Sequence, residues 1–163
     1  WISTLDAQGR LNLAPYSFFN AFNYDPPIIG FSSIAWKDSV RNASETGEFV
    51  WNLVTRELGE RMNQTSAPLP HGQDEFAFAG LTQVPSQQVR APRVGECRAA
   101  MECKVIDIVN KHNIVVLEAV AAYIDCARKE KRTVHAVGDG TFIVDGRKID
   151  RKKMMASRLP SGV

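Results

Sequence analysis

The order of apolar and polar positions along the chain predicts a protein built mainly from strands. Residues 1–5 (W-I-S-T-L) and 10–14 (R-L-N-L-A) fit two strands joined at the turn-forming residues Asp6-Ala7-Gln8-Gly9. Asp25-Pro26-Pro27 then interrupts any helix and favours extended backbone. Further strands are expected at residues 28–32, 49–54, 99–109, 114–124 and within 133–144.

Helical patterns are short and few. Lys37 to Thr46 predicts a helix with Asp38 or Ser39 as its N-cap and Gly47 at its C-terminal end. Arg56 to Asn63 predicts a second helix, and residues 74–79 a single helical turn after a loop at 64–73. Strict alternation of strands and helices is absent, which argues against a doubly wound sheet. The expected fold class is mainly β, a closed or partly closed antiparallel barrel with a few short peripheral helices.

Composition is that of an ordinary globular protein, with 163 residues of which 44% are hydrophobic and 23% are charged. We therefore expect one domain over residues 1–163, able to bury a core without disulfides. The chain begins at Trp1, inside an expected strand, so a preceding N-terminal segment is expected to be missing. No apolar run approaches the ~18–20 residues that span a bilayer, and no signal peptide is recognised. The expected location is the cytoplasm, away from membranes.

The cysteines and histidines give no sign of a metal site or a disulfide framework. Cys97, Cys103 and Cys126 are odd in number and irregularly spaced, which favours reduced thiols. The histidines lie far apart in the sequence, at His71, His112 and His135. We therefore predict no bound metal.

Charge is unevenly distributed. Residues 128–163 hold ten Lys/Arg and four Asp/Glu, a net +6, whereas the remainder holds ten and fourteen, a net −4. This basic C-terminal extension, with R-K-E-K-R at 128–132 and R-K-I-D-R-K-K at 147–153, fits either nucleic-acid or phosphate binding or a solvated surface. No nucleic-acid-binding motif accompanies the charge, so we favour the solvated surface and expect no nucleic-acid partner.

Two stretches offer chemistry suited to a ligand. Ala14 to Asn20 (A-P-Y-S-F-F-N) mixes aromatic rings with small polar groups and fits neither a strand nor a helix pattern, so it either plugs the core or lines a site for a flat ligand. Phe31 to Asn42 ends a strand with two serines and opens a helix with Lys37, Asp38 and Ser39. A helix N-terminus beside a lysine suits a phosphate, although simple capping explains the same residues. Together the stretches suit a planar heterocycle carrying a phosphate, such as flavin mononucleotide (FMN) or another nucleotide, and neither a Rossmann nor a P-loop motif is present.

The motifs resemble those of the flavin reductase-like family. The resemblance rests on W-I-S-T-L-D-A-Q-G-R-L-N-L-A-P-Y-S-F-F-N, D-P-P-I-I-G-F-S-S, W-K-D-S-V-R-N, T-G-E-F-V-W-N-L, A-G-L-T and A-P-R-V, which follow in order over about residues 1–94. That family includes the reductase components of two-component monooxygenases such as the nitrilotriacetate system. The resemblance implies an FMN-binding split β-barrel and a homodimer with flavin near the subunit interface.

The resemblance also implies roles for individual residues. Ser3 and Thr4 would lie near the flavin, and Ser32 and Ser33 would reach its ribityl chain or phosphate. Lys37, Asp38 and Ser39 would close the phosphate site, with Lys37 supplying positive charge and Asp38 its backbone N–H. The residues that would wrap the isoalloxazine ring are Tyr16, Ser17, Phe18, Phe19 and Asn20. His71, in the loop Pro68 to Gly72, would either cover the flavin or donor site or remain an exposed loop histidine.

The function implied is that of an NAD(P)H:flavin oxidoreductase. Hydride transfer from NADH or NADPH belongs to the cofactors, so no protein acid, base or nucleophile is required. FMN, or FAD, would be held tightly or exchanged as a substrate, and reduced flavin would pass to a flavin-dependent monooxygenase. An FMN-binding electron-transfer module without NAD(P)H reductase activity is the alternative, and a nucleic-acid-binding barrel is a third and weaker one.

Overall fold

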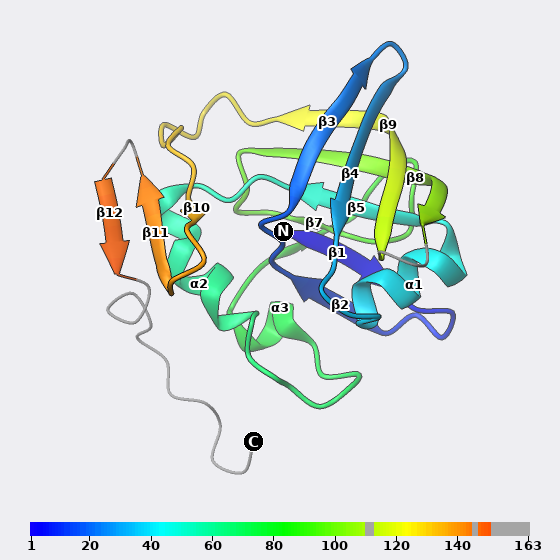
Figure 1. Ribbon diagram of the computed structural model, residues 1–163, viewed down its shortest axis with the longest axis horizontal. Coiled ribbons are helices and arrows are strands. Elements are labelled where there is room, and N and C mark those ends of the chain that lie inside the picture. Colours follow the sequence, from blue (N-terminus) through cyan, green and yellow to red (C-terminus); the bar gives the residue numbers. More distant parts are fainter. Residues whose placement is uncertain (110–112, 145–146, 151–163) are drawn as a thin grey trace.

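The computed structural model describes residues 1–109, 113–144 and 147–150. A seven-stranded antiparallel sheet, ordered β2-β1-β5-β8-β9-β4-β3, forms the body of the molecule (Figure 1). Its strands are β1 (Ile2–Leu5), β2 (Leu11–Ala14), β3 (Phe19–Tyr24), β4 (Pro27–Ser32), β5 (Glu48–Asn52), β8 (Ala99–Val109) and β9 (Ile114–Ile124).

The sheet curls into a split barrel. The ring of Phe19 in β3 lies 5.6 Å from the ring of Trp51 in β5, although β8, β9 and β4 separate these strands in the sheet. Bulges in the β8–β9 pairing occur between Glu102 and Cys103 and between Val105 and Asp107. Because bulges bend a strand and increase its twist, they help the sheet to close on itself. The mainly β barrel class expected from the sequence is therefore confirmed.

The two long central strands have the bounds that the sequence predicts. β8 and β9 pair from Ala99 opposite Ile124 to Val109 opposite Ile114. Three residues of the expected turn between them, 110–112, lie outside the described residues, whereas Asn113 has a left-handed φ of 51°. Asn is among the few residues that adopt this conformation readily.

The edge strand β3 is absent from the sequence prediction. All six of its residues are exposed, so they show no alternation of buried and exposed positions. β3 pairs with β4 from Phe19 opposite Phe31 to Tyr24 opposite Pro27, and this hairpin projects from the barrel (Figure 1). The stretch after Tyr16 is therefore partly strand, contrary to the irregular segment expected.

The helices lie where the sequence places them, with one correction. α1 (Asp38–Thr46) ends at Gly47, whose φ of 71° is the left-handed conformation expected there. Its N-cap is Lys37, whose side chain makes no capping bond, so the expected cap at Asp38 or Ser39 is wrong. The remaining helices are η1 (Arg56–Leu58), α2 (Gly59–Gln64) and α3 (Glu75–Phe78).

Two apolar clusters hold α1 and the other helices against the sheet. The cluster beneath α1 contains Val40 and Ala43 of the helix and, from the barrel, Ile2, Phe31, Phe49, Cys103, Val115 and Leu117. The second cluster joins Trp1 and Leu13 to Met62 of α2, Phe76 of α3 and Phe142. Burial of large side chains such as Phe31, Phe49 and Phe76 contributes roughly 1.5–3 kcal/mol each.

Two smaller sheets flank the barrel. They comprise β6 (Gln83–Val84) with β7 (Arg93–Val94), and β10 (His135–Ala136), β11 (Thr141–Val144) and β12 (Arg147–Asp150). β10 and β11 confirm the strand content expected within 133–144. A bridge between Thr55 and Thr133 and a hydrogen bond from the Arg56 N–H to the Arg132 carbonyl (2.8 Å) attach this segment next to α2. The last thirteen residues of the basic extension, 151–163, lie outside the described residues.

Within the described ranges, none of the helices has the length and apolar character needed to cross a bilayer. In the same ranges, no group of three or more His, Cys, Asp or Glu side chains is arranged to hold a metal ion.

Candidate functional site

A cleft of about 430 Å³ opens beside the barrel, between segments that are far apart in the sequence. One wall is the linker between β2 and β3, and the facing walls come from the end of β5, from α2 and from the C-terminal sheet. Its lining includes Trp1, Pro15, Tyr16, Ser17, Phe19, Trp51, Asn52, Leu53, Val54, Met62, Asn63, Ser66, Thr133, Val134, His135, Ala136 and Phe142. Aromatic and aliphatic surface thus alternates with a few hydroxyl, amide and imidazole groups, a composition typical of small-molecule sites.

Tyr16 connects this cleft with the N-terminus of α1. Its ring packs against Phe31 with 4.7 Å between centroids, and its hydroxyl lies near Ser39 and Ser33. Burial raises the pKa of Tyr16 above its usual value of 10, although Ser39 and Ser33 oppose the shift. The phenol is therefore neutral at physiological pH and keeps its proton for donation.

The N-terminus of α1 offers positive electrostatic character. The first backbone N–H groups of an α-helix have no acceptor within the helix and carry a partial positive charge. Lys37, at the N-cap, is exposed and adds a full positive charge, whereas Ser39 in the first turn is 1% exposed. The Ser39 hydroxyl accepts a hydrogen bond from Asn12 Nδ2 at 2.8 Å, which fixes its position.

Ser33 presents a buried hydroxyl between β4 and α1. It is 6% exposed, and its Oγ has no hydrogen-bond partner of normal geometry, although it lies close enough to the Tyr16 hydroxyl to influence the pKa of that group. Buried polar groups are seldom left unpaired, because desolvation without a partner costs roughly 1–3 kcal/mol.

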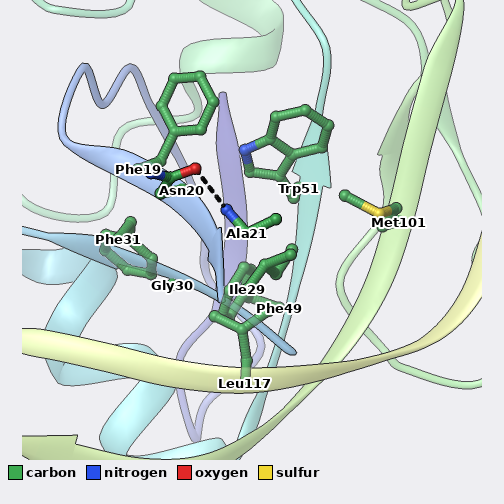
Figure 2. Close-up of a pocket in the computed structure, with 10 residues that line it drawn as sticks. All are labelled: Phe19, Asn20, Ala21, Ile29, Gly30, Phe31, Phe49, Trp51, Met101 and Leu117. Atoms are coloured by element: carbon green, nitrogen blue, oxygen red, sulfur yellow. Dashed lines mark hydrogen bonds between the residues drawn. The ribbon is translucent and has the colours of Figure 1, made fainter. Parts of the chain in front are cut away.

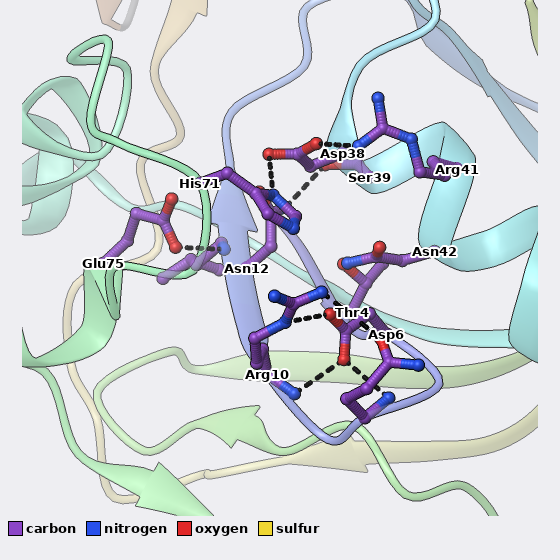
Figure 3. Close-up of polar contacts among 12 residues, drawn as sticks. Thr4, Asp6, Arg10, Asn12, Asp38, Ser39, Arg41, Asn42, His71 and Glu75 are labelled. Carbon is purple, nitrogen blue, oxygen red and sulfur yellow. Dashed lines mark hydrogen bonds and ion pairs between the residues drawn. The ribbon is translucent and has the colours of Figure 1, made fainter.

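Asp38 does not place an uncompensated negative charge at the helix N-terminus. Its Oδ1 accepts a hydrogen bond from Arg41 Nη1 at 2.7 Å, and its Oδ2 lies 3.1 Å from His71 Nδ1 (Figure 3). His71 belongs to the loop at residues 64–73, so this contact brings the loop against α1. The His71 ring is exposed and lies beside the candidate phosphate site, and its role toward the flavin stays a prediction.

A row of polar contacts continues from α1 along β1 and β2 (Figure 3). Asn42 Nδ2 donates to Thr4 Oγ1 at 3.0 Å, and Glu75 accepts the Leu13 N–H at 3.0 Å. Burial raises the pKa of Glu75. Burial would also raise the pKa of Asp6, but hydrogen bonds from Arg10 and Gln8 lower it.

The structure brings some of the sequence-predicted site residues together and separates others. Tyr16, Ser33, Lys37, Asp38 and Ser39 gather around the start of α1. Ser17 and Phe19 line the cleft, Phe18 and Asn20 are exposed nearby, and Ser32 is half-buried with its N–H bonded to the Phe18 carbonyl. Ser3 and Thr4 are fully buried in β1. Because their side chains alternate across the sheet, only Thr4 points toward α1.

Sequence reasoning missed three contributors to the site. Asn12 positions Ser39, Trp51 lines the cleft, and residues 133–136 form its far wall. Asn12 and Trp51 lie in the quoted motifs, and Trp51 is half-buried and packs against the barrel cluster as well. The far wall follows Trp51 by about eighty residues in the sequence. No local sequence pattern reveals that this segment packs against the cleft.

The chain matches the flavin reductase like domain family over residues 1–141. An uncharacterized protein from Aquifex aeolicus is 39% identical over 122 residues, which cover 72% of this chain and 62% of that relative's length. The chain thus spans less than two thirds of this relative. A protein from Shewanella frigidimarina NCIMB 400, described as a flavin reductase with a split barrel domain, has a TM-score of 0.79, 25% identity and coverage of 98% of this chain and 83% of that one. Nitrilotriacetate monooxygenase component B from Bacillus cereus has a TM-score of 0.72 and 26% identity, with coverage of 97% and 83%.

Proposed function

Because this chain belongs to the flavin reductase like domain family, we propose that it binds FMN between the Tyr16 cleft and the start of α1 and catalyses flavin reduction by NADH or NADPH. Family and fold support a flavin-related oxidoreductase. The observation that carries the finer proposal is the position of Tyr16, which lies in the cleft wall and beside the hydroxyl groups at the helix N-terminus.

The start of α1 suits the phosphate of FMN. It combines the free N–H groups of a helix N-terminus, the Lys37 ammonium group and the buried Ser33 hydroxyl, which has no partner of normal geometry. Asp38 already pairs with Arg41 and His71, which reduces its repulsion of a phosphate. This combination favours FMN over riboflavin, which has no phosphate. FAD would have to extend its second half beyond the same point.

The cleft suits the isoalloxazine ring. Tyr16, Phe19 and Trp51 offer apolar surface to a flat ring system, and the exposed Ser17 offers a hydroxyl group along the lining. The isoalloxazine supplies the hydride-accepting chemistry when bound. The protein's part is to orient the ring, exclude water from one side and hold the phosphate. The neutral Tyr16 hydroxyl adds a hydrogen-bond donor where the two halves of the site meet.

The reduced flavin is proposed to pass to a partner monooxygenase, as the name of the Bacillus cereus relative suggests for that protein. We also propose a homodimer. The uncharged edge strand β3 carries Phe22 (58% exposed) and Tyr24 (94% exposed), and Ile34 after β4 is 85% exposed. An exposed apolar edge strand promotes self-association unless it is covered, and a second copy would cover it.

Anaerobic absorbance spectra of the protein with FMN, recorded before and after NADH and then NADPH, test this function. A perturbed flavin spectrum that either donor bleaches supports the reductase and identifies the donor. A perturbed spectrum that neither donor bleaches would overturn the reductase in favour of the electron-transfer module. The Tyr16→Ala variant should lose most of the spectral perturbation, whereas Tyr123→Phe, on the far strand β9, should retain it.

A further inference from the structure

A second pocket, distinct from the cleft, opens inside the curl of the barrel. It has a volume of about 270 Å³ and lies between the β3–β4 hairpin on one side and strands β5, β8 and β9 on the other (Figure 2). Its lining consists of Phe19, Asn20, Ala21, Ile29, Gly30, Phe31, Phe49, Trp51, Met101 and Leu117. Apart from Phe19, Asn20 and Trp51, none of its lining residues is assigned a contact with the flavin.

The walls of this pocket carry no charge. Nine of its ten lining residues are apolar or glycine, and the remaining one is Asn20, whose amide oxygen accepts the Ala21 N–H at 2.9 Å. A charged ligand would lose hydration here without gaining an opposite charge. The pocket therefore suits an uncharged molecule, with the Asn20 amide group at the rim as its polar contact.

Size and ring content narrow the ligand further. An apolar cavity of roughly 150 Å³ accommodates benzene, so about 270 Å³ has room for one substituted ring or two fused rings. Phe19, Phe31, Phe49 and Trp51 present ring faces and edges, and Met101 adds a polarizable sulfur. Aromatic rings and thioethers both favour contact with a further aromatic ring.

We propose that this pocket binds an uncharged aromatic small molecule of one or two rings. Phe19 and Trp51 line both this pocket and the flavin cleft, and their rings pack together at 5.6 Å between centroids. The Phe19 and Trp51 rings therefore separate a ligand in the pocket from a ligand in the cleft. Binding at this site does not depend on the flavin proposal and can be measured on the flavin-free protein.

Calorimetric titration of the full chain with indole, a neutral molecule of two fused rings, tests the proposal. Indole is expected to bind with a Kd of about 0.1–1 mM, the range that ligand efficiency allows for so few atoms. Indole-3-acetate, which carries a carboxylate on the same rings, is expected to bind at least about tenfold more weakly because the lining has no cation to pair with it.

Two substitutions test whether indole binds in this pocket. Met101→Trp fills it from β8 and Ala21→Phe fills it from the edge strand β3, and each should weaken indole binding about tenfold or more. Ile106→Trp is the matched control, because Ile106 lies on β8 but is 55% exposed and outside the pocket. If Met101→Trp does not fold, Ala21→Phe still tests the site, because a larger side chain at the exposed Ala21 position does not disturb the core.

The absence of saturable indole binding would overturn the proposal. Unchanged binding to both filled variants would also overturn it, since indole would then bind elsewhere. A dimer that Ala21→Phe converts to monomers, without any indole binding to the unaltered chain, would show that a second copy covers the pocket instead.

Discussion

Two buried polar side chains, Glu102 and Ser33, differ in how completely their hydrogen bonds are made. On β8, Glu102 is fully buried, and both of its carboxylate oxygens accept backbone N–H groups, from Gln87 at 2.9 Å and from Gln88 at 2.5 Å. At the start of α1, Ser33 is almost as deeply buried, yet its hydroxyl lacks a partner of normal geometry. The Glu102 carboxylate is thus satisfied within the chain, whereas the Ser33 hydroxyl is left without such a partner.

The surroundings of Glu102 fit a structural role. Burial would raise the pKa of Glu102, but the Tyr123 hydroxyl and the N–H groups of Gln87 and Gln88 together lower it below its usual value. Arg93 stacks over the Tyr123 ring at 3.7 Å, which ties β7 to β9. These contacts fasten the segment between β6 and β7 to the outside of the barrel and point toward no cleft.

The comparison teaches that buried polar residues alone do not mark a site. Glu102 is the more unusual residue, since a fully buried carboxylate is rare, but backbone N–H groups already donate to both of its oxygens. The Tyr16 region is distinguished instead by the Ser33 hydroxyl, which has no partner of normal geometry, beside a helix N-terminus and an open cleft. Substitutions should therefore separate the two regions, with stability changing at the first and flavin affinity at the second.

Glu102→Gln should have the largest effect on stability. The neutral amide accepts only through its oxygen, so one of the two backbone N–H groups would lose its acceptor and the other would keep only an uncharged one. We expect a loss of about 2–4 kcal/mol in the free energy of unfolding. Urea denaturation measures it. Glu45→Gln, at an exposed position in α1, should change stability by less than about 0.5 kcal/mol. Equal effects of the two substitutions would contradict the structural role of Glu102.

Acid titration of stability sharpens the same contrast. Because the folded-state pKa of Glu102 is lowered, its stabilising contribution is fully present above the unfolded value of about 4.3 and is lost as pH falls through the folded-state pKa. The difference in the free energy of unfolding between the unaltered protein and the Glu102→Gln variant should therefore shrink below about pH 4. Denaturation midpoints at several pH values measure this, and a deficit independent of pH would argue against the lowered pKa.

Lys37→Ala should weaken FMN binding about tenfold while leaving stability unchanged, because the exposed ammonium group acts on the phosphate and makes no contact that folding requires. Fluorescence titration with FMN and with riboflavin measures the effect. Riboflavin affinity should be unchanged in Lys37→Ala. The control Lys104→Ala, at an exposed position on β8, should change the affinity for neither FMN nor riboflavin. An equal loss of affinity for both flavins would contradict phosphate binding at the start of α1.

Ser33→Ala should leave the free energy of unfolding unchanged or raise it by up to about 1 kcal/mol, because it removes a buried hydroxyl that has no partner of normal geometry. FMN affinity should fall about fivefold in the same variant. Ser39→Ala is its counterpart, since loss of the 2.8 Å bond from Asn12 should destabilise by about 1 kcal/mol. Destabilisation by Ser33→Ala would show that its hydroxyl is paired within the chain.

His71→Ala should have the smallest effect on the free energy of unfolding, a loss of less than about 0.5 kcal/mol, because its contact with Asp38 is partly exposed to solvent. Thermal denaturation at low and high salt measures it. A larger loss would mean that the contact, rather than local packing, holds the loop at residues 64–73 against α1.

Much of the barrel could be predicted from the sequence because its strands are buried on at least one face. β8 and β9 have long β-type runs that end at a turn, and their bounds are confirmed to the residue. β3 could not be found, because an exposed edge strand has no alternation to detect. The cap of α1 was misplaced because Asp38 and Ser39 are ordinary capping residues, whereas contacts with Arg41, His71 and Asn12 occupy their side chains instead.

The site was predictable in part for the same kind of reason. Tyr16 and the residues from Ser33 to Ser39 lie in short local motifs, and the structure brings them together. The cleft's far wall depends on a bridge between Thr55 and Thr133, a long-range pairing that no window of sequence contains. The side-chain roles proposed for Ser3, Phe18 and Asn20 remain predictions.

A crystal structure of the protein with FMN tests the central claim most directly. We predict the isoalloxazine ring in the cleft against Tyr16 and the phosphate at the N-terminus of α1, within hydrogen-bonding distance of Ser33 and Lys37. A flavin bound with its phosphate away from α1, or a Ser33 hydroxyl that stays unpaired beside the bound flavin, would contradict the account.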